Sequence, residues 1–196
     1  MKRYNFGEDE SYLFEQNLLG IDNFDDLELA EQFAFTVRSL EMECGKFTMN
    51  SFNLASLMAL HHYLFQDIYR FAGKIREVQL IKGETRFCQM QYILPMCEKL
   101  FTELAQEADW PNVEIAAQRL AYYKSELNMI HPFREGNGRV IRLFIHAYAK
   151  SKGYFWDFAK LERDGYLQAM IDAVLDPNKL QNIFMQTLQK GDCPQQ

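Results

Sequence analysis

A long apolar stripe in the second half of the chain limits the possible folds more than any other feature. Its members recur at steps of three and four residues, which is the spacing of one helix face. They are Val113, Ala116, Leu120, Tyr123, Leu127 and Ile130. Pro132 disfavours helical geometry in the residue before it, so this helix ends near His131. A second helix is predicted from Gly138 to about Lys152, and the chain is therefore built around two helices joined by a short loop.

Similar stripes predict that most of the remaining chain is helical. Two further sets of apolar positions have the spacing of buried helix faces. They are Leu27, Ala30, Phe33, Ala34, Val37 and Leu40, then Leu54, Leu57, Met58, His61 and Leu64. Residues 76–81 and 85–88 instead predict two short strands around a glycine turn. We therefore expect an all-α fold with one small hairpin that leans on the helices, because an isolated hairpin is only marginally stable.

Length and charge exclude several classes of protein. A chain of 196 residues fits one domain, and we expect a core at about 25–190, an N-terminal extension at 1–24 and a tail at 191–196. The net charge of −6 gives no overall attraction to a nucleic-acid backbone or an anionic membrane. No run approaches the ~20 apolar residues of a membrane-spanning helix, and the four cysteines lack metal-site spacing. We expect a cytoplasmic protein that binds neither nucleic acid nor membrane.

The loop between the two long helices concentrates residues that suit an anion. Gly136 and Gly138 allow successive backbone amides to point into one concavity, and the following helix adds its positive end. Arg139 and Arg142 share a face in the first turns, where cations are unfavourable unless an anion is bound. Two guanidinium groups can hold separate phosphates. The loop therefore predicts a polyphosphate site.

Two more residues of the loop suit a transfer reaction. Glu135 would place a carboxylate beside bound phosphates, an arrangement that a bridging magnesium ion explains. His131 is the obvious base for an incoming hydroxyl. Singly, each has a structural alternative: a helix-end histidine, a glutamate paired with Arg139, or a plain Gly-Asn-Gly turn. Together they favour a functional loop.

The segment His-Pro-Phe-Arg-Glu-Gly-Asn-Gly-Arg-Val-Ile-Arg, residues 131–142, resembles the signature of the Fic (filamentation induced by cAMP) domain family at every specified position. That signature is His-x-Phe-x-(Asp/Glu)-Gly-Asn-Gly-Arg-x-x-Arg. The resemblance extends upstream, where residues 62–78 look like the helix that leads into the Fic flap and residues 82–87 look like the flap. It implies a helical Fic-type domain with a β-hairpin flap beside the active-site loop between two central helices.

The resemblance also implies an activity. Fic proteins typically transfer AMP from ATP to a hydroxyl side chain of a target protein and release pyrophosphate. By this likeness His131 is the general base and Glu135 the Mg²⁺ ligand. The implied nucleotide-binding residues are Gly136, Asn137, Gly138, Arg139 and Arg142. The implied flap residues, which would dock the target by strand addition, are Lys82, Gly83, Thr85 and Phe87.

Several relatives suggest alternative reactions. The intact Glu135, Gly136 and Gly138 speak against the Doc branch, which resembles Fic, departs at the glycines and phosphorylates its target. Transfer of UMP or phosphocholine and removal of AMP occur in other relatives, and the motif does not separate them. A module that binds a nucleotide or a protein without turnover is a further alternative, although the complete motif speaks against it.

Regulation is predicted from the N-terminal residues. Many Fic proteins carry an inhibitory helix, (Ser/Thr)-x-x-x-Glu-(Gly/Asn), whose glutamate pairs with the second motif arginine, here Arg142. The stretch from Ser11 to Glu15 is a near-match, but Gln16 follows it. Residues 12–21 instead resemble the start of Fic toxins that a separate small antitoxin inhibits. We expect such an antitoxin as a partner, and the toxin-like resemblance suggests a type II topoisomerase subunit as the target.

Overall fold

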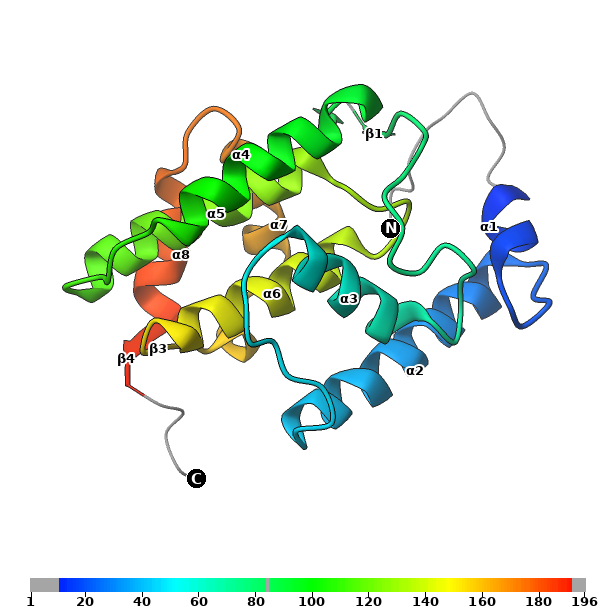
Figure 1. Ribbon diagram of the computed structural model, residues 1–196, viewed down its shortest axis with the longest axis horizontal. Coiled ribbons are helices and arrows are strands. Elements are labelled where there is room, and N and C mark those ends of the chain that lie inside the picture. Colours follow the sequence, from blue (N-terminus) through cyan, green and yellow to red (C-terminus); the bar gives the residue numbers. More distant parts are fainter. Residues whose placement is uncertain (1–10, 84, 192–196) are drawn as a thin grey trace.

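The computed structural model describes residues 11–83 and 85–191 as a predominantly helical fold (Figure 1). The α-helices are α1 (Ser11–Gln16), α2 (Phe24–Glu43), α3 (Leu54–Phe65), α4 (Ile93–Ala105), α5 (Val113–Ile130), α6 (Asn137–Ser151), α7 (Arg163–Asp172) and α8 (Asn178–Thr187). The 3-10 turns are η1 (Met90–Tyr92) and η2 (Phe158–Lys160). The strands are β1 (Ile81–Lys82), β2 (Thr85–Arg86), β3 (Tyr154–Trp156) and β4 (Leu188–Lys190). The predicted all-α fold with a small hairpin is confirmed.

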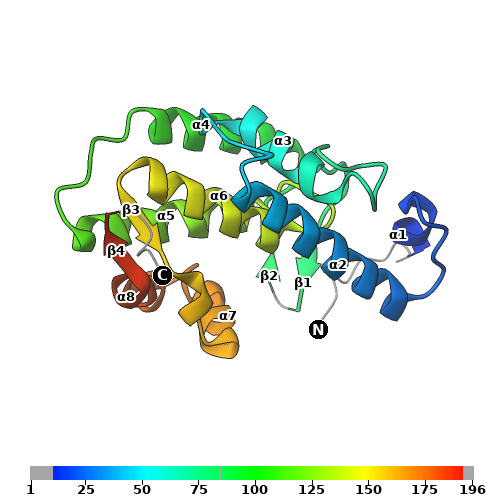
Figure 2. The same ribbon diagram turned by 90° about the horizontal axis from the view of Figure 1, so that it is seen from below.

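Helices α5 and α6 form the centre of the molecule, as the apolar stripe predicted. Figure 2 shows them between α3 and α4 on one side and α7 and α8 on the other. Asn112 caps the start of α5 by accepting a hydrogen bond from the backbone N–H of Ile115, 2.9 Å away. Leu120, Leu127 and Phe144 are fully buried, and burying a side chain of this size contributes about 2 kcal/mol. The loop between the two helices thus starts and ends on rigid elements.

The stripe predicted to be buried on α2 is buried only in part, so that prediction is wrong for half of its residues. Leu27 and Ala34 face the core, whereas Phe33, Val37 and Leu40 are exposed. Helix α2 lies at the margin of the molecule and packs along α3 (Figure 1), so the described part of the chain covers one narrow face of it. Helical spacing identifies a face, but it does not say whether another element covers that face.

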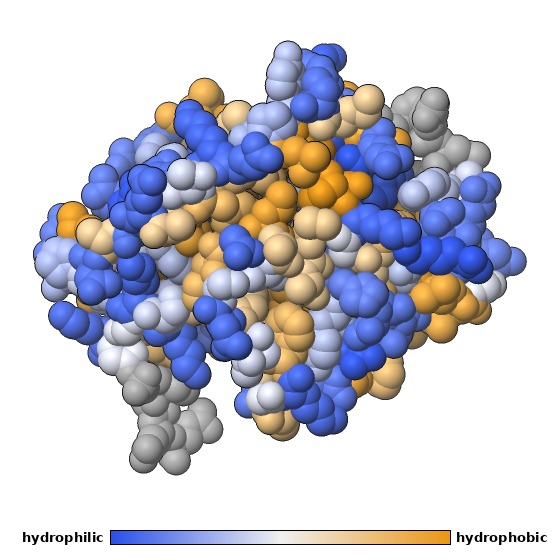
Figure 3. Space-filling view, in the orientation of Figure 1, coloured by the Kyte–Doolittle hydropathy of each residue, from blue (hydrophilic) through white to orange (hydrophobic). Residues whose placement is uncertain are grey.

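Exposed apolar residues are not confined to α2. Figure 3 shows hydrophobic residues gathered across the middle of one face, between hydrophilic margins. By contrast, the stripe predicted on α3 is buried as expected at Leu57, His61 and Leu64. Helix α3 packs against α6 as well as α2, which explains why its apolar positions are covered.

The hairpin is shorter than predicted. Its two strands pair antiparallel over two residues each, with Ile81 opposite Arg86 and Lys82 opposite Thr85. Residues 76–80 lie outside the strands, although Leu80 C=O accepts a hydrogen bond from Phe87 N–H at 3.1 Å. The Arg76 side chain donates hydrogen bonds to backbone carbonyls at the end of α5 and holds the start of this segment there. A second small sheet, β3 with β4, was not predicted, since its three-residue strands lie far apart in sequence.

The ends of the chain are only partly described. In the predicted extension at 1–24, the segment from residue 11 packs against the turn after α3, where Leu18 N–H donates to Ile68 C=O at 2.8 Å. Residues 1–10 and 192–196 lie outside the described residues, so the division into extension, core and tail stays a prediction. Across residues 11–83 and 85–191, none of the helices has the length and apolarity needed to span a membrane.

Candidate active site

The loop between α5 and α6 is held by hydrogen bonds within itself. His131 ends α5 with a left-handed backbone (φ 49°), and Gly136 begins α6 with φ 78°. The fully buried Asn137 side chain accepts from Phe133 N–H at 2.8 Å and donates to Phe133 C=O at 2.7 Å. The amide of Asn137 therefore closes the loop, and its side chain is already engaged inside the protein.

Side chains from neighbouring elements fix the same loop. His61 on α3 accepts from Gly73 N–H at 2.7 Å through Nδ1, so its Nε2 carries the proton donated to Glu135 C=O at 3.0 Å. Its ring stacks on Phe133 with centroids 3.9 Å apart. Arg76 donates from Nε to His131 C=O at 2.7 Å. The sequence placed His61 on a buried helix face and Arg76 in a strand, and it gave no sign that either residue holds the loop.

The two glycines of the loop have different surroundings. A Cβ at Gly136 would lie 2.4 Å from Phe65 Cε2, and its positive φ also favours glycine. A Cβ at Gly138 would meet no atom within 4 Å. No described side chain caps the start of α6, so the first amides of this helix lack a side-chain acceptor at its positive end. This is the arrangement that an anion requires.

His131 is buried and neutral. Its Nδ1 lies 2.8 Å from Asn128 C=O, and because a carbonyl can only accept, Nδ1 carries the proton and Nε2 the basic lone pair. Burial lowers the pKa of His131 to about 3, and the charges of Arg76 and Lys82 act in the same direction. The Phe87 ring stacks on the imidazole with centroids 3.7 Å apart. A neutral base thus lies under the flap.

The predicted flap residues share one hairpin beside this histidine. Lys82 lies in β1, Gly83 turns with φ 61°, Thr85 lies in β2, and Phe87 follows β2. Phe87 is 6% exposed and covers His131 instead of facing solvent. The structure therefore brings the flap and the predicted base into contact.

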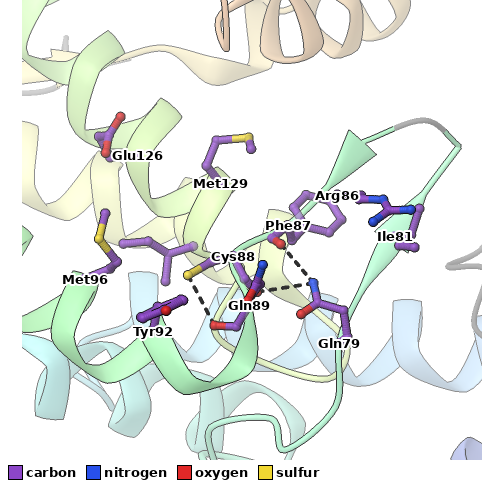
Figure 4. Close-up of a pocket in the computed structure, with 11 residues that line it drawn as sticks. Gln79, Ile81, Arg86, Phe87, Cys88, Gln89, Tyr92, Met96, Glu126 and Met129 are labelled. Carbon is purple, nitrogen blue, oxygen red and sulfur yellow. Dashed lines mark hydrogen bonds between the residues drawn. The ribbon is translucent and has the colours of Figure 1, made fainter.

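A cavity of about 610 Å³ lies beside the hairpin (Figure 4). Its walls come from the flap, from η1 and α4, and from the last turns of α5, and they are mostly apolar. The lining residues that Figure 4 labels on the α4 and α5 sides are Tyr92, Met96, Glu126 and Met129. Ile130, the residue before His131, also lines it. The cavity therefore lies between the flap and the end of α5, next to the residue that precedes the histidine.

Arg139 is paired with carboxylates. Its Nη2 lies 2.5 Å from Glu31 on α2 and 3.7 Å from Glu135, and its guanidinium stacks over Phe65 at 4.8 Å. Glu31 also accepts a hydrogen bond from the Tyr69 hydroxyl. Burial raises the pKa of Glu31, and the nearby charge of Glu135 raises it further. Sequence reasoning missed Glu31, because it lies 108 positions before Arg139 and within an apolar stripe.

Glu135 fits a magnesium ligand in one respect. One of its oxygens accepts from Gly136 N–H at 2.8 Å, and its side chain stays 22% exposed at the edge of the loop. The described residues hold no group of three metal-ligating side chains. A single carboxylate beside an anion site suits Mg²⁺, which usually binds through one or two carboxylates together with phosphates and water.

Arg142, one turn further along α6, has different neighbours. Its Nε is buried and forms no hydrogen bond with any described residue, and its guanidinium lies over the Phe158 ring at 5.5 Å. Burial lowers the pKa of Arg142. The two arginines predicted to grip phosphates are therefore unequal: Arg139 already has counter-charges, and Arg142 has none among the described residues.

Comparisons with known proteins agree with this geometry. A family model described as the Fic/DOC family matches residues 51–149. The protein adenylyltransferase VbhT of Bartonella schoenbuchensis is 36% identical over 160 residues, which cover 80% of this chain and 33% of VbhT. The probable protein adenylyltransferase y4lH of Sinorhizobium fredii is 36% identical over 159 residues, which cover 80% of this chain and 81% of y4lH. The chain thus spans a third of one relative and most of the other.

The fold is also similar to solved structures. The crystal structure of BepC, a VirB-translocated effector of Bartonella tribocorum with bound AMPPNP, matches with a TM-score of 0.81 at 20% identity. The match covers 90% of this chain and 93% of BepC. At this identity the likeness establishes the fold alone, and it confirms the fold predicted from the sequence.

Proposed function

Because this chain belongs to the Fic/DOC family, we propose that it is a protein adenylyltransferase, which transfers AMP from ATP to a hydroxyl side chain of a target protein and releases pyrophosphate. Two relatives at 36% identity carry this name, and one of them is matched over most of its length. The observation that carries the proposal is the pairing of an uncapped, glycine-bounded helix start with a neutral histidine one loop away. The helix start can bind phosphates, and the histidine can accept a proton from an alcohol.

In the proposed reaction His131 acts as the general base. Its Nε2 takes the proton of the target hydroxyl while the hydroxyl oxygen attacks the α-phosphorus of ATP. The new O–P bond forms as the bond to the β-phosphate oxygen breaks, and pyrophosphate leaves with that electron pair. Because burial lowers the pKa of His131 to about 3, the ring is neutral at physiological pH and its Nε2 carries no proton.

The donor would be held by the loop and the start of α6. The backbone amides of Gly136, Asn137 and Gly138 form the proposed anion hole, in which the Gly136 N–H would leave its present acceptor, Glu135. Arg139 and Arg142 are the proposed contacts to the outer phosphates. Transfer of this kind depends mainly on positioning and on stabilising negative charge. Glu135 is the proposed ligand of Mg²⁺, which when bound would neutralise charge on the phosphates.

The acceptor would be held by the flap. Lys82, Gly83, Thr85 and Phe87 are the proposed docking residues, since a target segment could add a strand to the short hairpin. The adjacent cavity of about 610 Å³ has room for a neighbouring side chain of that segment. A displacement of Phe87, which covers His131, would let the acceptor hydroxyl reach the base.

Control by a separate antitoxin is also part of the proposal. Arg142 forms no ion pair with a carboxylate of the described residues, and this includes Glu15 on α1. A glutamate from another protein could therefore occupy this position. The proposed target is a type II topoisomerase subunit. The proposed location is the cytoplasm, where ATP is available.

The test is mass spectrometry of a cell lysate supplied with isotope-labelled ATP, Mg²⁺ and the purified protein. Wild type is expected to add one adenylyl group to a protein hydroxyl, and His131→Ala to add none. His62→Ala is the matched control, because His62 is an exposed histidine of α3 outside the loop. Modification by a different nucleotide moiety, or equal labelling by wild type and His131→Ala, would contradict the proposal.

A further inference from the structure

Lys124 on α5 is a buried cation that the proposed reaction does not use. The residue is 2% exposed. Its Nζ lies 5.6 Å from the ring centroid of Trp156 in β3 and 5.5 Å from that of Tyr166 in α7. Within residues 11–83 and 85–191, the Lys124 amino group takes part in no hydrogen bond or ion pair. The amino group therefore lies beside two aromatic rings.

The charged group that acts on Lys124 has the same sign. Arg142 on α6 faces it, and Tyr166 on α7 is the other titratable group against it. Burial lowers the pKa of Lys124 to about 7, and the charge of Arg142 lowers it further. Arg142 itself has a buried Nε without a partner among the described residues. Two cations thus lie together with no described carboxylate between them.

Such an arrangement is unfavourable while both groups are charged, so Lys124 loses its proton readily unless an anion is bound. A buried charge costs several kcal/mol when no opposite charge or hydrogen bond compensates it. A cation over an aromatic ring gains about 2 kcal/mol at most, which does not offset burial beside a second cation. By comparison, Arg139 is compensated by Glu31 at 2.5 Å. The Lys124 and Arg142 pair has the composition of a phosphate site before its ligand arrives.

We propose that Lys124 is a further nucleotide-binding residue, which together with Arg142 forms a two-cation pocket for the outer phosphates of the donor. This inference rests on the proposed function, because it takes the polyphosphate of ATP as the ligand. Lys124 is largely neutral above neutral pH in the free protein. Bound phosphate favours the charged ammonium, so nucleotide binding at pH 7.5 draws a proton from solution.

Calorimetric titration of the full chain with AMPPNP and Mg²⁺ tests the pocket. Lys124→Met removes the charge and keeps an apolar side chain of similar length, and it is expected to weaken AMPPNP binding about tenfold. Pyrophosphate binding should weaken to the same extent, whereas AMP, which lacks the outer phosphates, should bind both proteins equally. Lys179→Met is the control, since Lys179 is an exposed lysine on α8 and should bind like wild type.

Proton uptake supplies a second readout. Titrations at pH 7.5 in two buffers of different ionisation enthalpy should show proton uptake by wild type on binding AMPPNP and none by Lys124→Met. If that variant fails to fold, the ¹³Cε resonance of Lys124 in the wild-type chain, followed against pH with and without AMPPNP, should show a pKa raised by the nucleotide.

The outcomes separate this inference from the proposed function. If Lys124→Met binds AMPPNP as tightly as wild type, or if the nucleotide does not change the pKa of Lys124, then Lys124 is a packing residue. The protein would still bind the nucleotide, so the proposed function would not be affected. Weakened binding of AMP together with AMPPNP would place Lys124 away from the outer phosphates and overturn the pocket. A wild-type chain that binds no nucleotide would overturn the proposed function as well.

Discussion

The active-site loop and the flap meet at His131, yet they are built in opposite ways. The loop is fixed by the Asn137 side chain from within and by His61 and Arg76 from outside. The flap is a hairpin of two residue pairs, Ile81 with Arg86 and Lys82 with Thr85. The difference indicates that the donor side of the proposed reaction is formed in advance, while the acceptor side is lightly held and can adapt to a target backbone.

The largest predicted difference between the two regions comes from one substitution made in each. Gly136→Ala adds a Cβ that would lie 2.4 Å from Phe65 in a left-handed backbone, and it should lower the free energy of unfolding by about 4 kcal/mol. Gly83→Ala in the flap has a similar positive φ and open space around the Cβ, so it should cost only about 1 kcal/mol. Urea denaturation measures both. Equal losses would show that the loop is no more constrained than the flap.

A second substitution tests the closure of the loop. Asn137→Ala leaves the backbone N–H and C=O of Phe133 buried without their partners, which should cost about 3 kcal/mol. Thr85→Ala in β2 is the flap counterpart and should change stability by less than about 0.5 kcal/mol. Thermal unfolding of the two variants provides the comparison. A loop that tolerates Asn137→Ala without loss would contradict the view that this side chain is structural.

The pH dependence of stability should come mainly from two histidines, one in the active-site loop and one that holds it. Burial lowers the pKa of His131 to about 3 and that of His61 to about 4, so the unfolded chain binds more protons below pH 6.5. Stability is therefore complete above pH 6.5 and falls as the pH decreases, by about 1 kcal/mol for each histidine between pH 7.5 and 5.5. Urea denaturation at both pH values should show a smaller fall for His131→Ala than for wild type, because one of the two groups is gone. An identical fall in wild type and His131→Ala would refute the assignment.

The smallest expected effect lies in the flap. Arg86 is exposed in β2 and lines the cavity beside the hairpin, away from the loop. Arg86→Ala should change stability by less than about 0.5 kcal/mol and leave AMPPNP affinity unaltered, while KM for the target protein rises. Steady-state kinetics with a purified target, beside nucleotide titration, measure the two effects. A change in nucleotide affinity would show that the flap also belongs to the donor side.

The loop was predictable from the sequence because its determinants are local. Two helices with regular apolar spacing and the residues 131–142 at their junction carry the site, and the structure keeps that order. The contacts of Glu31, Arg76 and Lys124 were not predictable, because each depends on how distant elements pack. The same reason applies to the exposed Phe33, since spacing defines a helix face and packing decides its burial.

The lengths of the strands were also not predicted correctly from the sequence. The residues around Gly83 predicted longer strands than form, because Arg76 binds backbone carbonyls that a longer ladder would need. Strands β3 and β4 carry too few residues for a pattern to be recognised before β4 is known to pair with β3.

The most direct test of the account is the fate of phosphate label in parallel reactions with ATP labelled at the α-phosphate or at the γ-phosphate. Wild-type protein, Mg²⁺ and lysate should give labelled target only from the α-labelled donor, and His131→Ala should give none from either. Label arriving from the γ-phosphate, or α-label transferred at full rate without the imidazole, would contradict adenylyl transfer with His131 as the base.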